Sequence, residues 1–217
     1  MSFKSAPPAK KTSHSAGRAQ QVRIIGGQWK RTPLPVLSAD GLRPTPDRVR
    51  ETVFNWINHL FDGFWAQRDC LDMFAGSGAL GFEAASRGAR RVCLWENHTP
   101  AFVQLQANKA KLQAEQIELL RCDAIAQSRR VPAASFDLIF IDPPYQSQLS
   151  AQALQLAAGL LKKGGLIYLE LPREQELPAW LDEWLIVRQD CAGMIAFFLL
   201  SHQIEAKGIS KNRSERD

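Results

Sequence analysis

Leu138-Ile-Phe-Ile-Asp-Pro-Pro-Tyr145 decides the fold, because a short apolar run ends here in a carboxylate, two prolines and an aromatic ring. Four apolar residues between Asp137 and Asp142 predict a strand that is buried on both faces. Proline has a fixed φ and no N–H, so the strand is expected to end at Asp142. Strands of this kind are typical of parallel sheets that helices cover on both sides.

The chain around this strand alternates between short apolar runs and amphipathic stretches. Such alternation predicts βαβ units, and therefore a parallel sheet with helices on both faces. The expected strands are Cys70–Phe74, Val92–Trp95, Ile117–Leu120, Leu138–Ile141 and Leu166–Leu171, and the expected helices between them are Leu80–Ser86, Ala101–Leu112 and Ala151–Leu161.

The end of the chain departs from this alternation. The apolar runs Leu185–Gln189 and Met194–Leu200 are joined only by Asp190–Gly193, and so short a link permits only an antiparallel pair. The expected fold is therefore α/β: a doubly wound, mostly parallel, seven-stranded sheet of Rossmann-like type that ends in an antiparallel hairpin.

A small extension is expected ahead of the sheet. Val22–Ile25 and Gln28–Lys30 predict a β-hairpin whose turn is Gly26-Gly27, because glycine supplies the positive φ of a tight turn. Thr45 is the expected N-cap of a helix that has Pro46 at its first position. The expected organisation is a disordered basic tail (1–21), a hairpin and helix extension packed on the core (22–62), the sheet domain (63–203) and a polar tail (204–217).

A glycine-rich loop, Asp72-Met-Phe-Ala-Gly-Ser-Gly-Ala-Leu-Gly81, joins the first strand of the sheet to the next helix. Its glycines allow a ligand to approach the backbone at a helix N-terminus, and Glu96 at the end of the second strand is placed for ribose hydroxyls. The G-x-G-x-x-G spacing fits both NAD and S-adenosylmethionine. Asp72 favours S-adenosylmethionine, because a buried carboxylate suits an ammonium group and would repel a pyrophosphate.

Further acids follow the third and fourth strands. Asp123 is placed for the adenine amine, and each such acid alone is more often a simple strand-end or cap residue. The residues expected to contact the cofactor are Asp72, Phe74, Ala75, Gly76, Ser77, Gly78, Glu96, Asn97, Asp123, Ala124 and Asp142.

The turn that follows the fourth strand suits a planar base with an amine. The two prolines hold the carbonyls of Asp142 and Pro143 rigidly, and these oxygens with the Asp142 carboxylate can accept amine hydrogens while Tyr145 stacks on the ring. An isolated Asp-Pro-Pro is also consistent with ordinary turn chemistry. The expected catalytic residues are Asp142, Pro143, Pro144 and Tyr145.

Basic residues gather at the start of the chain. The net charge is +5, and seven lysines and arginines precede Asp40, the first acidic residue. This arm fits either a phosphate-rich partner or a solubilising tail. Its composition also resembles an organellar transit peptide, although Pro7-Pro8 argues against an amphipathic helix.

No metal or membrane segment is expected. The four cysteines and four histidines have no metal-like spacing, and the longest apolar run, Met194–Leu200, is too short to span a bilayer. We therefore expect a cytoplasmic protein, and a monomer.

These motifs together resemble class I S-adenosylmethionine-dependent methyltransferases, and closely resemble the bacterial 16S rRNA (guanine(966)-N(2))-methyltransferase family. The resemblance is carried by Arg23-Ile-Ile-Gly-Gly-Gln-Trp29, Gly41-Leu-Arg-Pro-Thr-Pro-Asp-Arg-Val-Arg-Glu-Thr52, the glycine-rich loop and Asp142-Pro-Pro-Tyr145. It implies the strand order 3-2-1-4-5-7-6 and methylation of a guanine amine in 16S rRNA, in the 30S subunit or an assembly intermediate. The expected RNA contacts are Arg23, Arg43, Thr45, Arg48 and Arg50, although solvated charges would look the same in sequence.

Three other functions fit parts of the sequence. A DNA adenine or protein glutamine methyltransferase would share the Asp-Pro-Pro-Tyr turn. A nicotinamide-dependent oxidoreductase would share the glycine-rich loop, and a non-catalytic assembly factor that binds rRNA would share the basic residues.

Overall fold

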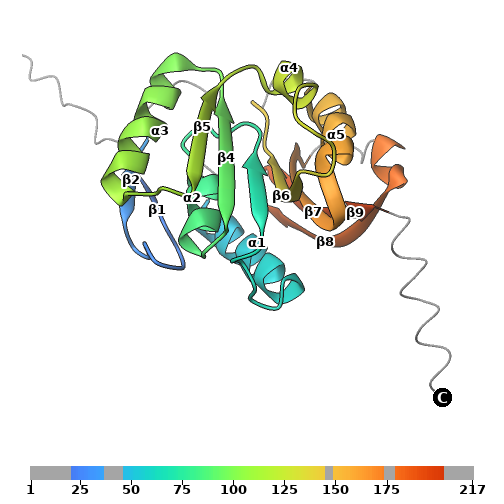
Figure 1. Ribbon diagram of the computed structural model, residues 1–217. Helices are drawn as coiled ribbons and strands as arrows, with labels where there is room; N and C mark the ends of the chain where they lie inside the picture. Colours follow the sequence, from blue (N-terminus) through green and yellow to red (C-terminus); the bar gives the residue numbers. More distant parts are fainter. Residues whose placement is uncertain (1–20, 37–45, 145–148, 174–178, 203–217) are drawn as a thin grey trace, which may run out of the picture.

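The computed structural model describes residues 21–36, 46–144, 149–173 and 179–202 of the chain. Their centre is a seven-stranded sheet with the strand order β5-β4-β3-β6-β7-β9-β8 (Figure 1). The strands of this sheet are β3 (Asp69–Asp72), β4 (Arg91–Glu96), β5 (Ile117–Arg121), β6 (Phe136–Ile141), β7 (Leu161–Pro172), β8 (Trp184–Ala192) and β9 (Ile195–His202).

Neighbouring strands pair in parallel from β5 to β7, whereas β9 is antiparallel to both β7 and β8. This arrangement confirms the doubly wound sheet, its C-terminal antiparallel hairpin and the strand order 3-2-1-4-5-7-6 expected from the sequence. β3 lies beside both β4 and β6, so the chain reverses its winding direction at β3. In open α/β sheets such a switch point forms a crevice at the carboxyl ends of the strands.

Two hydrophobic cores cover the two faces of the sheet. One face packs against α1 (Asp47–Leu60), α2 (Ala79–Ser86) and α3 (Thr99–Leu112), and the other packs against α4 (Ala124–Ser128) and α5 (Leu149–Leu160) (Figure 1). Strand residues alternate between the two cores: Cys70 and Leu138 belong to the first, and Leu71 and Ile139 to the second. A short 3-10 helix, η1 (Ala179–Glu183), precedes β8.

The N-terminal extension forms a hairpin, but not with the turn expected from the sequence. β1 (Gln21–Arg23) pairs with β2 (Pro33–Pro35), and Gln28–Lys30 forms no strand. Gly27 does have a positive φ of 75°, yet it serves to bring the chain against α2: the backbone N–H of Gln28 donates to the carbonyl of Ser86. The positive φ at the Gly26-Gly27 pair was therefore predicted correctly. The contact that this turn makes with Ser86 of α2, far away in sequence, was not predicted.

The first helix starts slightly later than expected. α1 begins at Asp47 with Pro46 in the N-cap position, where no side-chain hydrogen bond caps the helix. The expected N-cap, Thr45, lies outside the described residues. Ile24, Trp29 and Leu34 of the extension join the same core as α1 and the sheet, so the extension packs directly on the first face.

Candidate active site

Three carboxylates mark the carboxyl ends of three neighbouring strands. Asp72 ends β3, Glu96 ends β4, and Asp142 directly follows β6. β3 is the central strand of the three, and its turn is tied to both neighbours: Met73 donates its N–H to the Phe140 carbonyl, and Ala75 donates to the Trp95 carbonyl. The glycine-rich loop, which is expected to bind the cofactor, therefore lies at the same edge of the sheet as the turn that begins at Asp142. Because this turn is expected to bind the methyl acceptor, it is called the acceptor turn below.

Asp72 is almost completely buried beneath the glycine-rich loop. Its side chain is 2% exposed, and its Oδ2 accepts the backbone N–H of Gly81 in α2 at 3.0 Å. Burial raises the pKa of Asp72 to about 7; the hydrogen bond from Gly81 opposes this shift, while the negative charge of Glu96 adds to it. A carboxylate in such a place is stabilised in its charged form by a cation, so the position fits an ammonium group.

The glycine-rich loop holds Glu96 in a fixed orientation. Gly76 donates its N–H to Glu96 Oε2 at 2.7 Å, and His98 donates to Glu96 Oε1 at 2.6 Å. A carboxylate can accept about four hydrogen bonds, so both oxygens retain capacity for hydroxyl donors. The half-buried Glu96 thus fits the ribose of a nucleoside.

Gly78 is required by the packing of this loop. Its φ is 79°, and a Cβ at this position would lie 2.5 Å from a Phe82 ring carbon and 2.6 Å from a Leu105 methyl carbon. Of the other expected cofactor residues, Ala75 and Ala124 are buried, Phe74, Gly76 and Ser77 are half-buried, and Asn97 is exposed.

Asp123 has a local structural role as well as a position at this edge. It is exposed, and its Oδ1 caps α4 by accepting the N–H of Ala126 at 2.8 Å. Cys122, which precedes Asp123, donates its N–H to the Glu96 carbonyl at 3.2 Å. This hydrogen bond holds Asp123 at the same edge of the sheet as Glu96.

The acceptor turn combines access with rigidity. Asp142 is half-buried, Pro143 is buried and Pro144 is exposed, whereas Tyr145 lies outside the described residues. β6 lies directly beside β3, with Phe140 paired to Asp72. Asp142 therefore stands two residues beyond the level of Asp72 on the adjacent strand.

The arginines expected to contact RNA divide into two groups. Arg23 and Arg48 are exposed, while Arg43 and Thr45 lie outside the described residues. The structure contradicts the expectation for Arg50, whose side chain is completely buried and donates to the Arg23 carbonyl at 2.8 Å and to Asp47 at 2.6 Å. Arg50 ties the extension to α1 and cannot reach a phosphate.

Two buried acids were not identified from the sequence. Glu83 of α2 is completely buried and accepts the N–H groups of Ile25 and Gly26. Glu170 of β7 is 8% exposed and accepts the hydroxyl of Tyr168. Both stand within otherwise apolar stretches, and this isolated charge is the signal that would have marked them.

The opposite edge of the sheet carries an ion-pair cluster. Although burial raises the pKa of Asp69, hydrogen bonds from Arg90 and Lys162 lower it to about 2. A shallow depression of about 490 Å³ lies beside this cluster, lined by Asp69, Arg90, Arg91, Glu115, Gln116 and Glu118. Asp69, Arg90, Arg91 and Glu118 are already paired with one another there. The depression also lies at the amino ends of β3 and β4, so it does not compete with the carboxyl edge as the active site.

Within the described ranges, no group of three or more His, Cys, Asp or Glu side chains is placed to hold a metal ion. In the same part of the chain, no helix has the length and apolar character needed to cross a bilayer.

Comparison with known proteins gives consistent relatives. Ribosomal RNA small subunit methyltransferase D of Escherichia coli K12 is 39% identical over 203 residues, which cover 93% of this chain and 98% of that protein. The Haemophilus influenzae protein of the same name is 39% identical over 186 residues, which cover 82% and 93%. A solved structure of a putative methyltransferase from Escherichia coli, yhhF, superposes with a TM-score of 0.74 at 36% identity and covers 84% of this chain and 98% of its own.

Residues 22–201 also match the family model described as conserved hypothetical protein 95. This match spans the extension, the sheet and both edges described above. The chain therefore belongs to the conserved hypothetical protein 95 family and to the family of ribosomal RNA small subunit methyltransferase D.

Proposed function

We propose that this protein transfers the methyl group of S-adenosylmethionine to the exocyclic N2 amine of a guanine in the RNA of the small ribosomal subunit. The observation that carries the proposal is the adjacency of two sites on neighbouring strands. Asp72 ends β3 and leads into the glycine-rich loop, and Asp142-Pro143 follows β6 on the adjacent strand. The chain is also 39% identical to ribosomal RNA small subunit methyltransferase D.

The cofactor site is assigned to the carboxylates at the strand ends. Asp72 binds the ammonium of the methionine part, Glu96 binds the ribose hydroxyls, and Asp123 accepts from the adenine amine. The burial of Asp72 supports this fit, because a cation beside the carboxylate would oppose the rise in pKa that burial causes. Bound there, S-adenosylmethionine supplies an electrophilic methyl group on its sulfonium.

The acceptor site is assigned to the turn after β6. Asp142 and the Pro143 carbonyl accept the hydrogens of the guanine amine, which draws the nitrogen lone pair out of conjugation, and Tyr145 stacks on the base. Transfer is direct, and no covalent intermediate with the protein forms. The amine proton becomes acidic only as the new N–C bond forms, so it leaves to Asp142 or to water.

The finer assignments rest on the family. We infer that the target is the guanine 966 type position of 16S rRNA, in the 30S subunit or an assembly intermediate. We also infer that the protein acts as a monomer in the cytoplasm and needs no metal. Exposed Arg23 and Arg48 are assigned to phosphate contacts.

The test uses small subunits from bacterial cells that lack this protein. Transfer of a labelled methyl group from S-adenosylmethionine is measured on these subunits, on their naked RNA and on duplex DNA, and the modified nucleoside is identified by mass. We expect N2-methylguanosine at a single site of the ribosomal RNA. N6-methyladenosine, methylated DNA or methylated protein would assign the protein to another class of amine methyltransferase.

Asp142→Ala tests the acceptor turn in the same assay. We expect turnover to fall about a hundredfold, equivalent to roughly 3 kcal/mol in the barrier, while the Kd for S-adenosylmethionine stays near that of the wild type. A variant with normal turnover and weakened cofactor binding would remove Asp142 from the acceptor site.

A further inference from the structure

A second carboxylate stands level with Asp142 on the neighbouring strand. The register of β6 and β7 pairs Phe140 with Tyr168 and Ile141 with Leu169. Asp142 directly follows Ile141 at the end of β6, and Glu170 follows Leu169 within β7. Continued one residue beyond the end of β6, this register places Asp142 beside Glu170, because neighbouring strands lie about 4.8 Å apart.

Both residues belong to the face of the sheet that α1 covers. Phe140 and Tyr168 lie in the core of that face, with ring centroids 6.0 Å apart, and Phe54 of α1 lies 5.7 Å from Phe140. Glu170 follows Tyr168 by two residues and therefore projects from the same face. The Tyr168 hydroxyl donates to Glu170 Oε1 at 2.5 Å, and the charge of Asp142 also acts on this hydroxyl.

Glu170 is an unusual residue for its strand. Its neighbours Ile167, Leu169 and Leu171 are buried and apolar, while Glu170 is itself only 8% exposed. Burying a carboxylate costs free energy, and an apolar residue at this position would pack without that cost. A carboxylate can accept about four hydrogen bonds, and the Tyr168 hydroxyl makes one of those to Glu170, so a carboxylate bonded in this way can accept a base N–H as well.

Guanine presents the donors that two adjacent carboxylates require. Its N2 amine is flanked by the ring N1–H, whereas the exocyclic amines of adenine and cytosine are flanked by a ring nitrogen that accepts. An extruded base is read by hydrogen bonds to this edge. A pair of acceptors, one for the amine and one for the ring N–H, therefore favours guanine and repels the adenine edge.

We propose that Glu170 is the residue that selects guanine, by accepting the ring N1–H while Asp142 accepts from the N2 amine. This inference rests on the proposed function and deepens it, because it derives the choice of base from the geometry of β6 and β7. The Tyr168 hydroxyl orients the Glu170 carboxylate and leaves Asp142 to the amine.

The test replaces the target guanine by 2-aminopurine, which keeps the C2 amine but has an acceptor in place of N1–H. Small subunit RNA is assembled from fragments that carry either base at the target, and kcat/KM is measured with labelled S-adenosylmethionine. The wild type should prefer guanine by at least about a hundredfold, because a site built for a hydrogen-bond donor rejects an analogue that lacks it. No transfer to the guanine RNA would refute the proposed function itself, before the selection of guanine is tested.

Glu170→Gln is the deciding variant, because glutamine has nearly the same shape, still accepts from Tyr168 and can donate to N1 of 2-aminopurine. We expect the preference for guanine to shrink to about tenfold or less, with an absolute gain on 2-aminopurine. Tyr168→Phe is the control for orientation, and it should reduce kcat/KM on guanine while keeping part of the preference. An equal fall on both bases, or an unchanged ratio, would overturn the inference and leave Glu170 a packing residue.

Discussion

Asp72 shows how one buried residue links cofactor binding to pH. In the native protein its pKa is about 7, compared with an ordinary value of 3.8, because burial penalises the charged carboxylate. A folded-state pKa above the unfolded value contributes stability that is fully present below pH 3.8 and is lost as pH rises through 7. An ammonium ligand needs the charged form, so its binding competes with the proton.

We therefore expect the affinity for S-adenosylmethionine to rise between pH 5.5 and 7.5, and binding at pH 6 to release close to one proton. Titration calorimetry in buffers of different ionisation enthalpy measures this release. Asp72→Asn should bind weakly with little dependence on pH, and Asp142→Asn should keep the proton release of the wild type. Proton uptake or no exchange at pH 6 would place the ammonium elsewhere.

The site residues also show what a sequence can predict. The placement of Asp72, Glu96 and Asp142 at one edge of the sheet was predictable, because each acid lies at the end of a recognisable strand and neighbouring parallel strands end at the same edge. Arg50 was misjudged because helical spacing cannot reveal a partner such as Glu83, whose carboxylate lies 3.9 Å from the buried guanidinium. Glu170 was not predicted as a site residue, because the role proposed for it depends on the register of β7 against β6, which the sequence does not show.

At the scale of elements, the extension is held on α2 by backbone hydrogen bonds to two side chains and one carbonyl. Ile25 and Gly26 donate to Glu83, Trp29 donates to the Ser86 hydroxyl, and Gln28 donates to the Ser86 carbonyl. Gly78 of the glycine-rich loop is the N-cap of α2. The same helix therefore orients the loop at one end and the extension, with its exposed Arg23, along its length.

Gly27→Ala tests this contact against a matched control. A Cβ on Gly27 would lie 1.9 Å from the Ser86 carbonyl oxygen, whereas Gly63, with nearly the same φ (74° against 75°), has nothing within 4 Å. Both variants pay about 1–2 kcal/mol for a left-handed residue. Gly27→Ala should cost at least about 2 kcal/mol more in the free energy of unfolding, because its clash also disrupts hydrogen bonds to Ser86. Equal losses in urea denaturation would show that the contact is dispensable.

Glu83→Ala provides a second test of the same contact. It removes a completely buried carboxylate from Arg50, Arg87 and two backbone donors, so we expect a loss of about 3–5 kcal/mol in unfolding free energy. Glu118, whose side chain is 60% exposed beside Arg91, is the matched control, and its replacement by alanine should cost less than about 1 kcal/mol. A stable Glu83→Ala variant would mean that the hydrogen bonds to Glu83 add little to the packing of the extension.

The elements themselves were largely predictable, because buried parallel strands and amphipathic helices leave strong patterns. Strands β3 to β9 lie within a few residues of their expected positions, apart from the earlier start of β7 at Leu161. β2 and α4 were missed because each has five residues or fewer, and Pro33 and Pro35 hide the strand character of β2. Short elements are decided by tertiary contacts, which periodicity does not record.

At the scale of the whole molecule, the arginines at the amino edge of the sheet differ from those near the extension in whether they are paired with acids. The amino edge of the sheet satisfies its arginines internally, through Asp69 and Asp137. Arg23 and Arg48 are instead exposed on or beside the extension. A protein that meets RNA through the extension would use these exposed charges and leave the paired ones in place.

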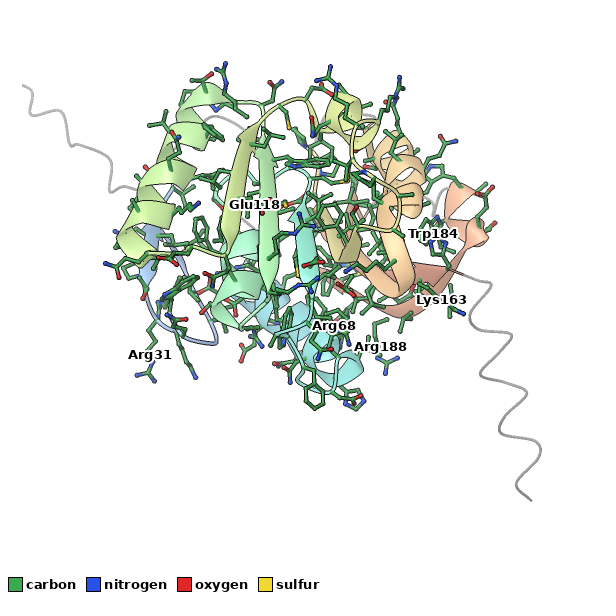
Figure 2. All side chains as sticks on the ribbon, in the orientation of Figure 1. Arg31, Arg68, Glu118, Lys163, Trp184 and Arg188 are labelled. Atoms are coloured by element: carbon green, nitrogen blue, oxygen red, sulfur yellow. The ribbon has the colours of Figure 1, made fainter. Side chains whose placement is uncertain are left out.

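Arg48→Ala should weaken binding to small subunit RNA and reduce the slope of log Kd against log salt by about one. Arg188 on β8 (Figure 2) is the control, since it is exposed and donates to the carbonyl of the neighbouring Val187. Its replacement by alanine should leave the slope unchanged. Identical slopes for both variants, measured by filter binding, would move the RNA surface away from α1.

The position of β9 has a consequence for a chain that is still being synthesised. Among the described strands β9 comes last in sequence, yet it lies inside the sheet between β7 and β8 and pairs Phe197 with Glu170. Until it emerges from the ribosome, β7 has a bare hydrogen-bonding edge that other chains can join. The sheet beside β7 is therefore incomplete until β9 has been synthesised, and we expect a nascent chain to act on ribosomal RNA only after that point.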